Sequence, residues 1–209
     1  MKEGDFIRID YVGRVESGEI FDLTDGALAK KEDIYNPNTP YKPIPVIIGA
    51  GFVIKGLDKE LEKMKVGEKK KVIVPPEEGF GKRDPKLIKV VNKKMFKDQP
   101  KVGMIINVQG AIGRIQSIDG GRVRIDFNNP LSGKKLEYEI EVKEEITGVS
   151  EKISAVMEFF GNSSSDVSVN AGTAEISGVR MSPDMKKRVS EIIKKYVSEV
   201  KSIRFVEEY

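Results

Sequence analysis

The residues with the clearest chemical potential are three aromatic side chains and one carboxylate. Tyr11 precedes the pair Phe21-Asp22, and Tyr138 follows much later in the chain. Aromatic rings form broad, apolar and rigid walls, and a carboxylate accepts hydrogen bonds, so this set could hold an apolar ring beside a polar group. On alternating strands the same rings are ordinary core residues, and Asp22 could equally cap a turn. The residue types alone leave both interpretations open.

Several other kinds of chemistry are excluded by composition and spacing. The chain has no histidine and no cysteine, which excludes Ser/His/Asp and Cys/His hydrolases and zinc sites built from Cys and His. Gly49 and Gly51 follow an apolar run and mimic a dinucleotide fingerprint, but Ile54 occupies the position of the required third glycine. We therefore expect no metal and no cofactor.

Composition places the chain among soluble globular proteins. Its 209 residues are 39% hydrophobic and 33% charged, with a net charge of +3. So small a charge argues against nucleic acid as a dedicated partner, and the run Lys69-Lys70-Lys71 is best interpreted as a solvated face. No apolar signal stretch opens the sequence, and no run is long enough to span a membrane. We expect a cytoplasmic location and no membrane partner.

The stretch from residue 46 to residue 81 predicts a short helix between two strands. Val46 to Ile48 form an apolar run that ends at a glycine turn. Leu57, Leu61 and Met64 recur at helical spacing, and Gly67 ends that helix because glycine adopts the left-handed capping conformation without steric cost. Residues 71–74 then form a strand that Pro75-Pro76 terminates. The pattern indicates a sheet curled around the helix, in an α+β fold.

The flanking segments supply the remaining strands. Residues 6–15 alternate apolar and polar side chains, residues 20–24 resume the pattern after a turn, and residues 136–142 alternate again. Residues 25–45 contain four prolines and are expected to form a long irregular loop. That loop could either cover a site or simply pack against the domain.

Three segments carry a resemblance to a known family. They are Ile47-Ile48-Gly49-x-Gly51-x-Val53-Ile54-x-Gly56-Leu57, then Met64-x-Val66-Gly67-Glu68, and Val74-Pro75-Pro76-Glu77-x-Gly79-Phe80-Gly81. Together with Tyr11-x-Gly13 and Gly18-x-x-Phe21-Asp22, they resemble FKBP-type peptidyl-prolyl cis/trans isomerases. The chain is most similar to the SlyD-like branch, which carries an inserted chaperone domain in its flap, and to its long archaeal-type form with an extra C-terminal domain. The resemblance implies an FKBP-like curled antiparallel sheet and rotation of Xaa-Pro amides.

The resemblance also implies a site. It assigns catalytic roles to Tyr11, Phe21, Asp22, Phe80 and Tyr138, and substrate binding to Ile44, Val53, Ile54 and Leu57. Asp22 would be the one buried carboxylate, hydrogen-bonded to Tyr11, and the backbone N–H of Ile54 would hold a substrate carbonyl. Many relatives have tryptophan at the position of Leu57 and an aromatic residue at that of Ile44. These departures are expected to weaken macrolide binding more than catalysis.

The domain organisation follows from the same comparison and from local composition. Residues 84–126 hold nine Lys or Arg against four Asp, and their strand-like pieces at 104–108, 111–118 and 122–127 are separated by glycine turns. We expect an isomerase domain at 1–83 plus 127–149 and an inserted chaperone domain at 84–126. An α-β-β-α-β domain at 150–209 would either form a homodimer or dock on the isomerase domain.

The expected partners are unfolded or partly folded proteins that contain proline. An alternative is a holdase or assembly adaptor that keeps the FKBP scaffold with little isomerase activity. A transcript-cleavage-type factor, a third class with a related fold, would need a long acidic-tipped coiled coil, and the sequence has no heptad run of that length.

Overall fold

The computed structural model describes residues 1–206 and divides the chain into two compact units. One unit comprises Met1–Val74 and Leu136–Tyr209, and the other comprises Pro75–Lys135. The inserted unit is therefore wider than the predicted 84–126, and contacts do not separate the C-terminal region from the isomerase region. Within residues 1–206, no helix combines the length and apolar character needed to cross a membrane.

The isomerase region is built on an antiparallel sheet of five strands. These are β1 (Phe6–Val15), β2 (Ile20–Leu23), β3 (Ile44–Ile47), β4 (Lys69–Val74) and β9 (Leu136–Ile146). The sheet order is β2-β1-β9-β4, and β3 pairs with the first half of β1. The strands predicted at 6–15, 20–24, 71–74 and 136–142 are all present, and β9 continues four residues further than expected.

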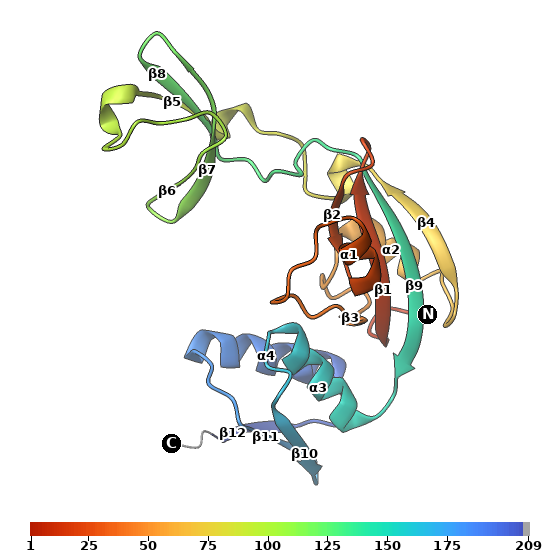
Figure 1. Cartoon of the computed structure of the whole chain (residues 1–209). Coiled ribbons are helices and arrows are strands. Elements are labelled where there is room, and N and C mark those ends of the chain that lie inside the picture. Colours follow the sequence, from red (N-terminus) through yellow and green to blue (C-terminus); the bar gives the residue numbers. More distant parts are fainter. Residues whose placement is uncertain (207–209) are drawn as a thin grey trace. The chain divides into compact units, whose positions relative to one another are not determined.

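Two short helices cover opposite faces of this sheet, α1 in front and α2 behind in Figure 1. Helix α2 (Lys55–Leu61) buries Leu57 and Leu61, and Met64 just beyond it is also fully buried. Gly67 has the left-handed conformation that the sequence predicts, with a φ of +82°. The prediction that it ends the helix was wrong, because α2 ends at Leu61 and the chain continues in tight turns, in which the N–H groups of Lys63 and Met64 donate to the carbonyls of Glu60 and Leu61. The predicted short helix between two strands is confirmed, in a mixed α+β fold.

The expectation for residues 25–45 was wrong in part, because this segment contains helix α1 (Gly26–Lys31). Its N-cap is Asp25, whose carboxylate accepts hydrogen bonds from the backbone N–H groups of Ala27 and Leu28. Ala29 is fully buried and is the one buried residue of this helix. A helix of six residues is too short to show a clear amphipathic period, and the four prolines of the segment therefore favoured the prediction of an irregular loop.

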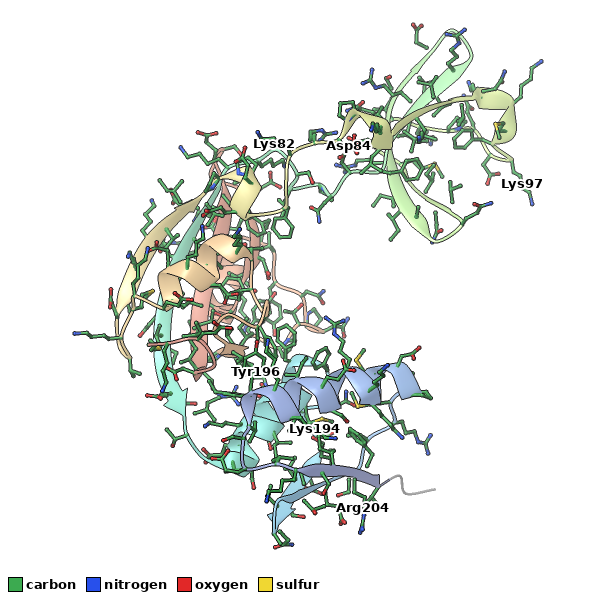
Figure 2. All side chains as sticks on the ribbon, turned by 180° about the vertical axis from the view of Figure 1, so that it is seen from behind. Lys82, Asp84, Lys97, Lys194, Tyr196 and Arg204 are labelled. Carbon is green, nitrogen blue, oxygen red and sulfur yellow. The ribbon has the colours of Figure 1, made fainter. Side chains whose placement is uncertain are left out.

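The C-terminal region has the predicted α-β-β-α-β order. Its elements are α3 (Val149–Phe159), β10 (Asp166–Asn170), β11 (Thr173–Ser177), α4 (Pro183–Tyr196) and β12 (Ser202–Val206). β11 pairs antiparallel with β10 and parallel with β12. The region shares one hydrophobic core with Phe6 and Ile47 of the isomerase region. Tyr196, labelled in Figure 2, lies close to Gly4. Dimerisation through 150–209 stays a prediction, which light scattering of the purified chain tests.

The inserted unit is a small four-stranded antiparallel sheet with its own core. Its strands are β5 (Ile88–Asn92), β6 (Ile105–Val108), β7 (Ala111–Asp119) and β8 (Arg122–Asp126), in the order β5-β8-β7-β6. The three-residue 3-10 helices η1 (Pro76–Glu78), η2 (Pro85–Leu87) and η3 (Lys93–Met95) lie before and after β5. Ile115, Val123 and Ile125 form the buried core. The sequence predicted the last three strands but not β5, whose lysine and asparagine break the alternation.

Candidate active site

A β-bulge places the predicted aromatic and acidic residues on one face of the sheet. Gly13 on β1 pairs with Asp22 on β2, and Arg14 pairs with Ile20, so Phe21 has no partner on β1. In a regular strand Phe21 and Asp22 would point to opposite faces. The extra residue re-aims the strand, as bulges commonly do beside active sites, and both side chains reach the face that carries Tyr11 and Tyr138.

The absent side chain of Gly13 creates the space in which two of these rings meet. Tyr138 on β9 lies directly opposite Gly13, and its ring contacts the Phe21 ring edge-on, with centroids 5.6 Å apart at 85°. A Cβ on Gly13 would lie 2.7 Å from Cζ of Phe21 and 3.0 Å from Cε1 of Tyr138. The ring of Tyr11 completes the group at 6.0 Å from that of Tyr138. These are ordinary distances for interacting aromatic rings.

The hydroxyl of Tyr11 donates a 2.7 Å hydrogen bond to Oδ2 of Asp22, the contact that the resemblance implies. The expectation that Asp22 is buried is nevertheless wrong, because its side chain is exposed. β2 is the outermost strand of the sheet at this point, so β1 covers it on one side only. Asp22 is therefore a solvent-accessible carboxylate at the rim of the aromatic group.

Electrostatics keep the two tyrosines of this group neutral. Burial raises the pKa of Tyr11 well above its ordinary value, and the hydrogen bond and negative charge of Asp22 raise it further. Burial also raises the pKa of Tyr138, with a second contribution from the charge of Asp22. The Tyr11 hydroxyl thus remains a hydrogen-bond donor over the whole physiological pH range.

Thr24 fixes the position of β2 against β1. This buried hydroxyl donates to Oδ1 of Asp10 at 2.8 Å and accepts from the backbone N–H of Tyr11 at 2.9 Å. The backbone N–H of Thr24 donates to the Tyr11 carbonyl at 3.0 Å. These bonds hold the end of β2 in a single register, and therefore hold Asp22 within reach of Tyr11. The role of Thr24 was not predictable from the sequence, because a threonine after a short strand is too common a pattern to signal it.

The predicted substrate-binding residues lie on one continuous segment. Ile44 begins β3 and pairs with Ile9, two residues before Tyr11 on β1. Val53 and Ile54 are half-buried in the turn that leads into α2, and Leu57 is buried in the first turn of that helix. The backbone N–H of Ile54 forms no hydrogen bond to any other residue of the described part of the chain. It is available to a ligand.

Phe80 lies in the inserted unit, Pro75–Lys135, whereas the other predicted site residues lie in the isomerase region. It follows η1, is half-buried, and its carbonyl accepts a 2.9 Å hydrogen bond from the hydroxyl of Ser132. The structure thus brings together Tyr11, Phe21, Asp22 and Tyr138, whereas Phe80 stays a prediction.

A groove of 610 Å³ opens beside the same sheet, and Tyr11 of the aromatic group is one of its lining residues. Asp10, Glu141 and Lys69 line it, together with Tyr41 and Pro43 from the segment before β3. Lys69 pairs with Glu141 at 3.2 Å, in agreement with the prediction that the lysine run is a solvated face. Eight of its fifteen lining residues are charged, an environment that suits an apolar proline ring poorly. We place the candidate site at the aromatic group instead.

Comparison with known proteins decides the family. The family model described as FKBP-type peptidyl-prolyl cis-trans isomerase matches residues 1–143. The chain belongs to this family. A short-type peptidyl-prolyl cis-trans isomerase of Methanocaldococcus jannaschii is 38% identical over 147 residues, which cover 69% of this chain and 93% of that relative. The chain is a peptidyl-prolyl cis/trans isomerase.

Two bacterial relatives support the same branch of FKBP-type isomerases. The FKBP-type 16 kDa isomerase of Escherichia coli K12 is 32% identical over 110 residues, covering 49% of this chain and 74% of the relative. The isomerase SlyD of Haemophilus influenzae is 36% identical over 107 residues, covering 48% and 56%. The resemblance to the SlyD-like branch is therefore confirmed. Residues beyond 143, which include α3 and the rest of the C-terminal region, lie outside the family match.

Proposed function

We propose that this FKBP-type isomerase rotates Xaa-Pro amides of folding proteins against the aromatic group of Tyr11, Phe21 and Tyr138. The observation that carries the proposal is the bulge-driven arrangement of these rings around Gly13, with the Asp22 carboxylate held at their rim by a 2.7 Å hydrogen bond. Three rings from three strands offer an apolar surface of the kind that fits a proline ring.

Rotation of the amide breaks no covalent bond, so the chemistry requires no nucleophile. The barrier of about 18–20 kcal/mol arises from the resonance that twisting removes. The twisted amide is less polar than the planar one, and a dry apolar surface stabilises it relative to water, with each 1.36 kcal/mol worth about tenfold in rate. The unpaired N–H of Ile54 would hold the substrate backbone while the proline rotates.

A short Xaa-Pro peptide tests this site. We expect the full-length protein to accelerate its cis-to-trans conversion, and Asp22→Ala and Phe80→Ala to reduce that acceleration. Glu139→Ala, in the charged groove, is the matched control and should leave the rate unchanged. Acceleration that survives in Asp22→Ala and Phe80→Ala but falls in Glu139→Ala would move the catalytic site to this groove.

We further propose that the inserted unit captures unfolded segments and supplies them to the isomerase site. Its surface exposes large apolar side chains, among them Val90 at 60%, Met95 at 74%, Ile105 at 67% and Ile112 at 66%. Exposed apolar surface of this density is typical of interaction sites. The excess of lysine and arginine among residues 84–126, such as Lys97 in Figure 2, favours segments that combine apolar and acidic residues.

Deletion of residues 84–126 tests the second role. A 2.8 Å hydrogen bond from the backbone N–H of Gly133 to the carbonyl of Gly81 holds the two connecting segments together outside the deleted region. We expect the shortened protein to keep its activity on short peptides and to lose most of its effect on proline-limited refolding of a protein. Equal losses on both substrates would refute this division of labour. A wild-type protein that prevents aggregation without accelerating either reaction would favour the holdase alternative.

A further inference from the structure

The segment from Lys42 to Ile54 is held at both ends by the last turn of α3. Before β3, Nζ of Lys42 lies 2.6 Å from Oε1 of Glu158. After β3, the ring of Phe52 packs on that of Phe159, with centroids 3.9 Å apart and an interplanar angle of 35°. Glu158 and Phe159 are consecutive residues, and we call this pair the α3 clamp. Between its two anchor points lies β3, which Figure 1 draws beside α3.

The aromatic half of the α3 clamp is part of a larger packed group. Phe160 contacts both Phe52 and Phe159 edge-on, at 6.4 Å and 5.4 Å. The guanidinium of Arg188 on α4 lies 5.4 Å from the ring centre of Phe160 and completes the group. Ala50 and Phe52 pack against the hydrophobic core that the C-terminal region contributes. The turn between β3 and α2 is therefore supported by residues that the family match does not include.

The charged half of the α3 clamp, Glu158, holds the other end of the segment at Lys42. The Glu158 side chain is only 13% exposed, and its Oε2 accepts a 2.7 Å hydrogen bond from Arg8 on β1. Lys42 makes an ion pair with the second oxygen, Oε1, without hydrogen-bond geometry. Arg8 also donates to the carbonyl of Pro43 at 3.3 Å. One carboxylate on α3 thus fixes both β1 and the residues that lead into β3.

We propose that the α3 clamp positions the substrate-binding segment of the isomerase site. Ile44 follows the charged anchor by two residues, and Val53 and Ile54 follow Phe52 directly. A shift of this segment would change the position of its apolar side chains and of the Ile54 N–H relative to the aromatic group. Neither Glu158 nor Phe159 would touch the substrate; both act through the segment that they hold. The inference rests on the proposed site, and it adds a function for the C-terminal region.

The test compares Phe159→Ala with Phe205→Ala in the full-length chain. Phe205 on β12 is another phenylalanine of the C-terminal region, half-buried where Phe159 is 37% exposed, and its ring lies under Lys186 rather than on Phe52. Two quantities are measured: the kcat and KM for a short Xaa-Pro peptide, and the amide hydrogen exchange of residues 49–56. Loss of a stacked ring should raise KM about three- to tenfold with kcat nearly constant, because binding geometry is what changes. Exchange of residues 49–56 should accelerate in Phe159→Ala and not in Phe205→Ala.

Two further variants keep the proposal falsifiable. Phe159→Tyr retains the ring and should restore KM, and Phe52→Ala should match Phe159→Ala, with the double variant no worse than either single one. Unchanged exchange and KM in Phe159→Ala, or equal effects in Phe205→Ala, would overturn the inference. A wild-type protein without peptide activity would refute the proposed function. In that case, faster exchange confined to Phe159→Ala and Phe52→Ala would still support the α3 clamp, and unchanged exchange would refute it.

Discussion

Substitution of Gly13 by alanine probes the aromatic group without removing any of its members. A Cβ at this position would lie 2.7 Å from Cζ of Phe21 and 3.0 Å from Cε1 of Tyr138. Carbon atoms pack at about 3.5–4.0 Å, so the rings must separate by roughly 1 Å. Such overpacking costs about 1–3 kcal/mol. The lower entropy of an alanine-containing unfolded chain returns about 0.4–1 kcal/mol.

We therefore expect Gly13→Ala to lower the free energy of unfolding by about 1–2 kcal/mol. If the displaced rings lose a similar amount of transition-state stabilisation, kcat/KM for a short Xaa-Pro peptide falls about five- to thirtyfold. Chemical denaturation measures the first quantity, and a peptide isomerisation assay far below the unfolding midpoint measures the second.

Gly113→Ala is the matched control. A Cβ at Gly113 on β7 would lie 2.7 Å from Cε1 of Phe127 and 2.8 Å from Cγ2 of Ile125, so the same change overpacks the inserted unit. We expect a comparable loss of stability there and no change in activity on short peptides. The reasoning fails if Gly13→Ala keeps its activity within twofold, or if Gly113→Ala loses as much.

Three other predictions concern protons and charges. Tyr11→Phe keeps the ring but removes the hydrogen-bond donor to Asp22; we expect about a tenfold loss of kcat/KM in the peptide assay, and an unchanged rate would remove that bond from the mechanism. The pKa values of Tyr11 and Tyr138 are raised, so the folded state binds their protons more tightly than the unfolded chain does. Denaturation at a series of alkaline pH values should therefore show a free energy of unfolding that is constant up to about pH 10 and falls above it. Asp22→Asn should make this loss of stability above pH 10 smaller, and an equal loss would contradict the contribution assigned to the charge of Asp22. Burial raises the pKa of Glu158, but its ion pairs outweigh that effect and hold the pKa below its ordinary value. Its stabilisation is therefore present at neutral pH and lost as the pH falls below about 4.5, and Glu158→Gln should cost about 1–2 kcal/mol in denaturation at pH 7 and little at pH 3.

The strands and the central helix were predictable because their burial imposes a period on the sequence. Residues 6–15 alternate since one face of β1 is buried, and glycine is favoured at position 67 by its positive φ. Helix α1 and strand β5 escaped prediction because six and five residues are too few to show a period beside prolines and lysines.

The residues of the site were predictable from the sequence, but their solvent exposure and tertiary contacts were not. The motif supplied Tyr11, Phe21 and Tyr138, and the structure brings their rings together. The exposure of Asp22 depends on β2 lying at the edge of the sheet, and strand order is not encoded locally. The contact between Phe52 and Phe159 joins residues far apart in the chain, and such pairings follow only from tertiary packing.

The two segments that connect the inserted unit to the isomerase sheet have a consequence for the order of folding. Val74 at the end of β4 pairs with Leu136 at the start of β9, so this pairing must close a loop that contains the whole of Pro75–Lys135. The hydrogen bond from the Gly133 N–H to the Gly81 carbonyl already holds these two connecting segments together. If the inserted unit folds first, the free loop shrinks from about sixty residues to about eight, which lowers the entropic cost of closure by about 2 kcal/mol. The insert would then act as an internal nucleus that draws the last two strands of the isomerase sheet together.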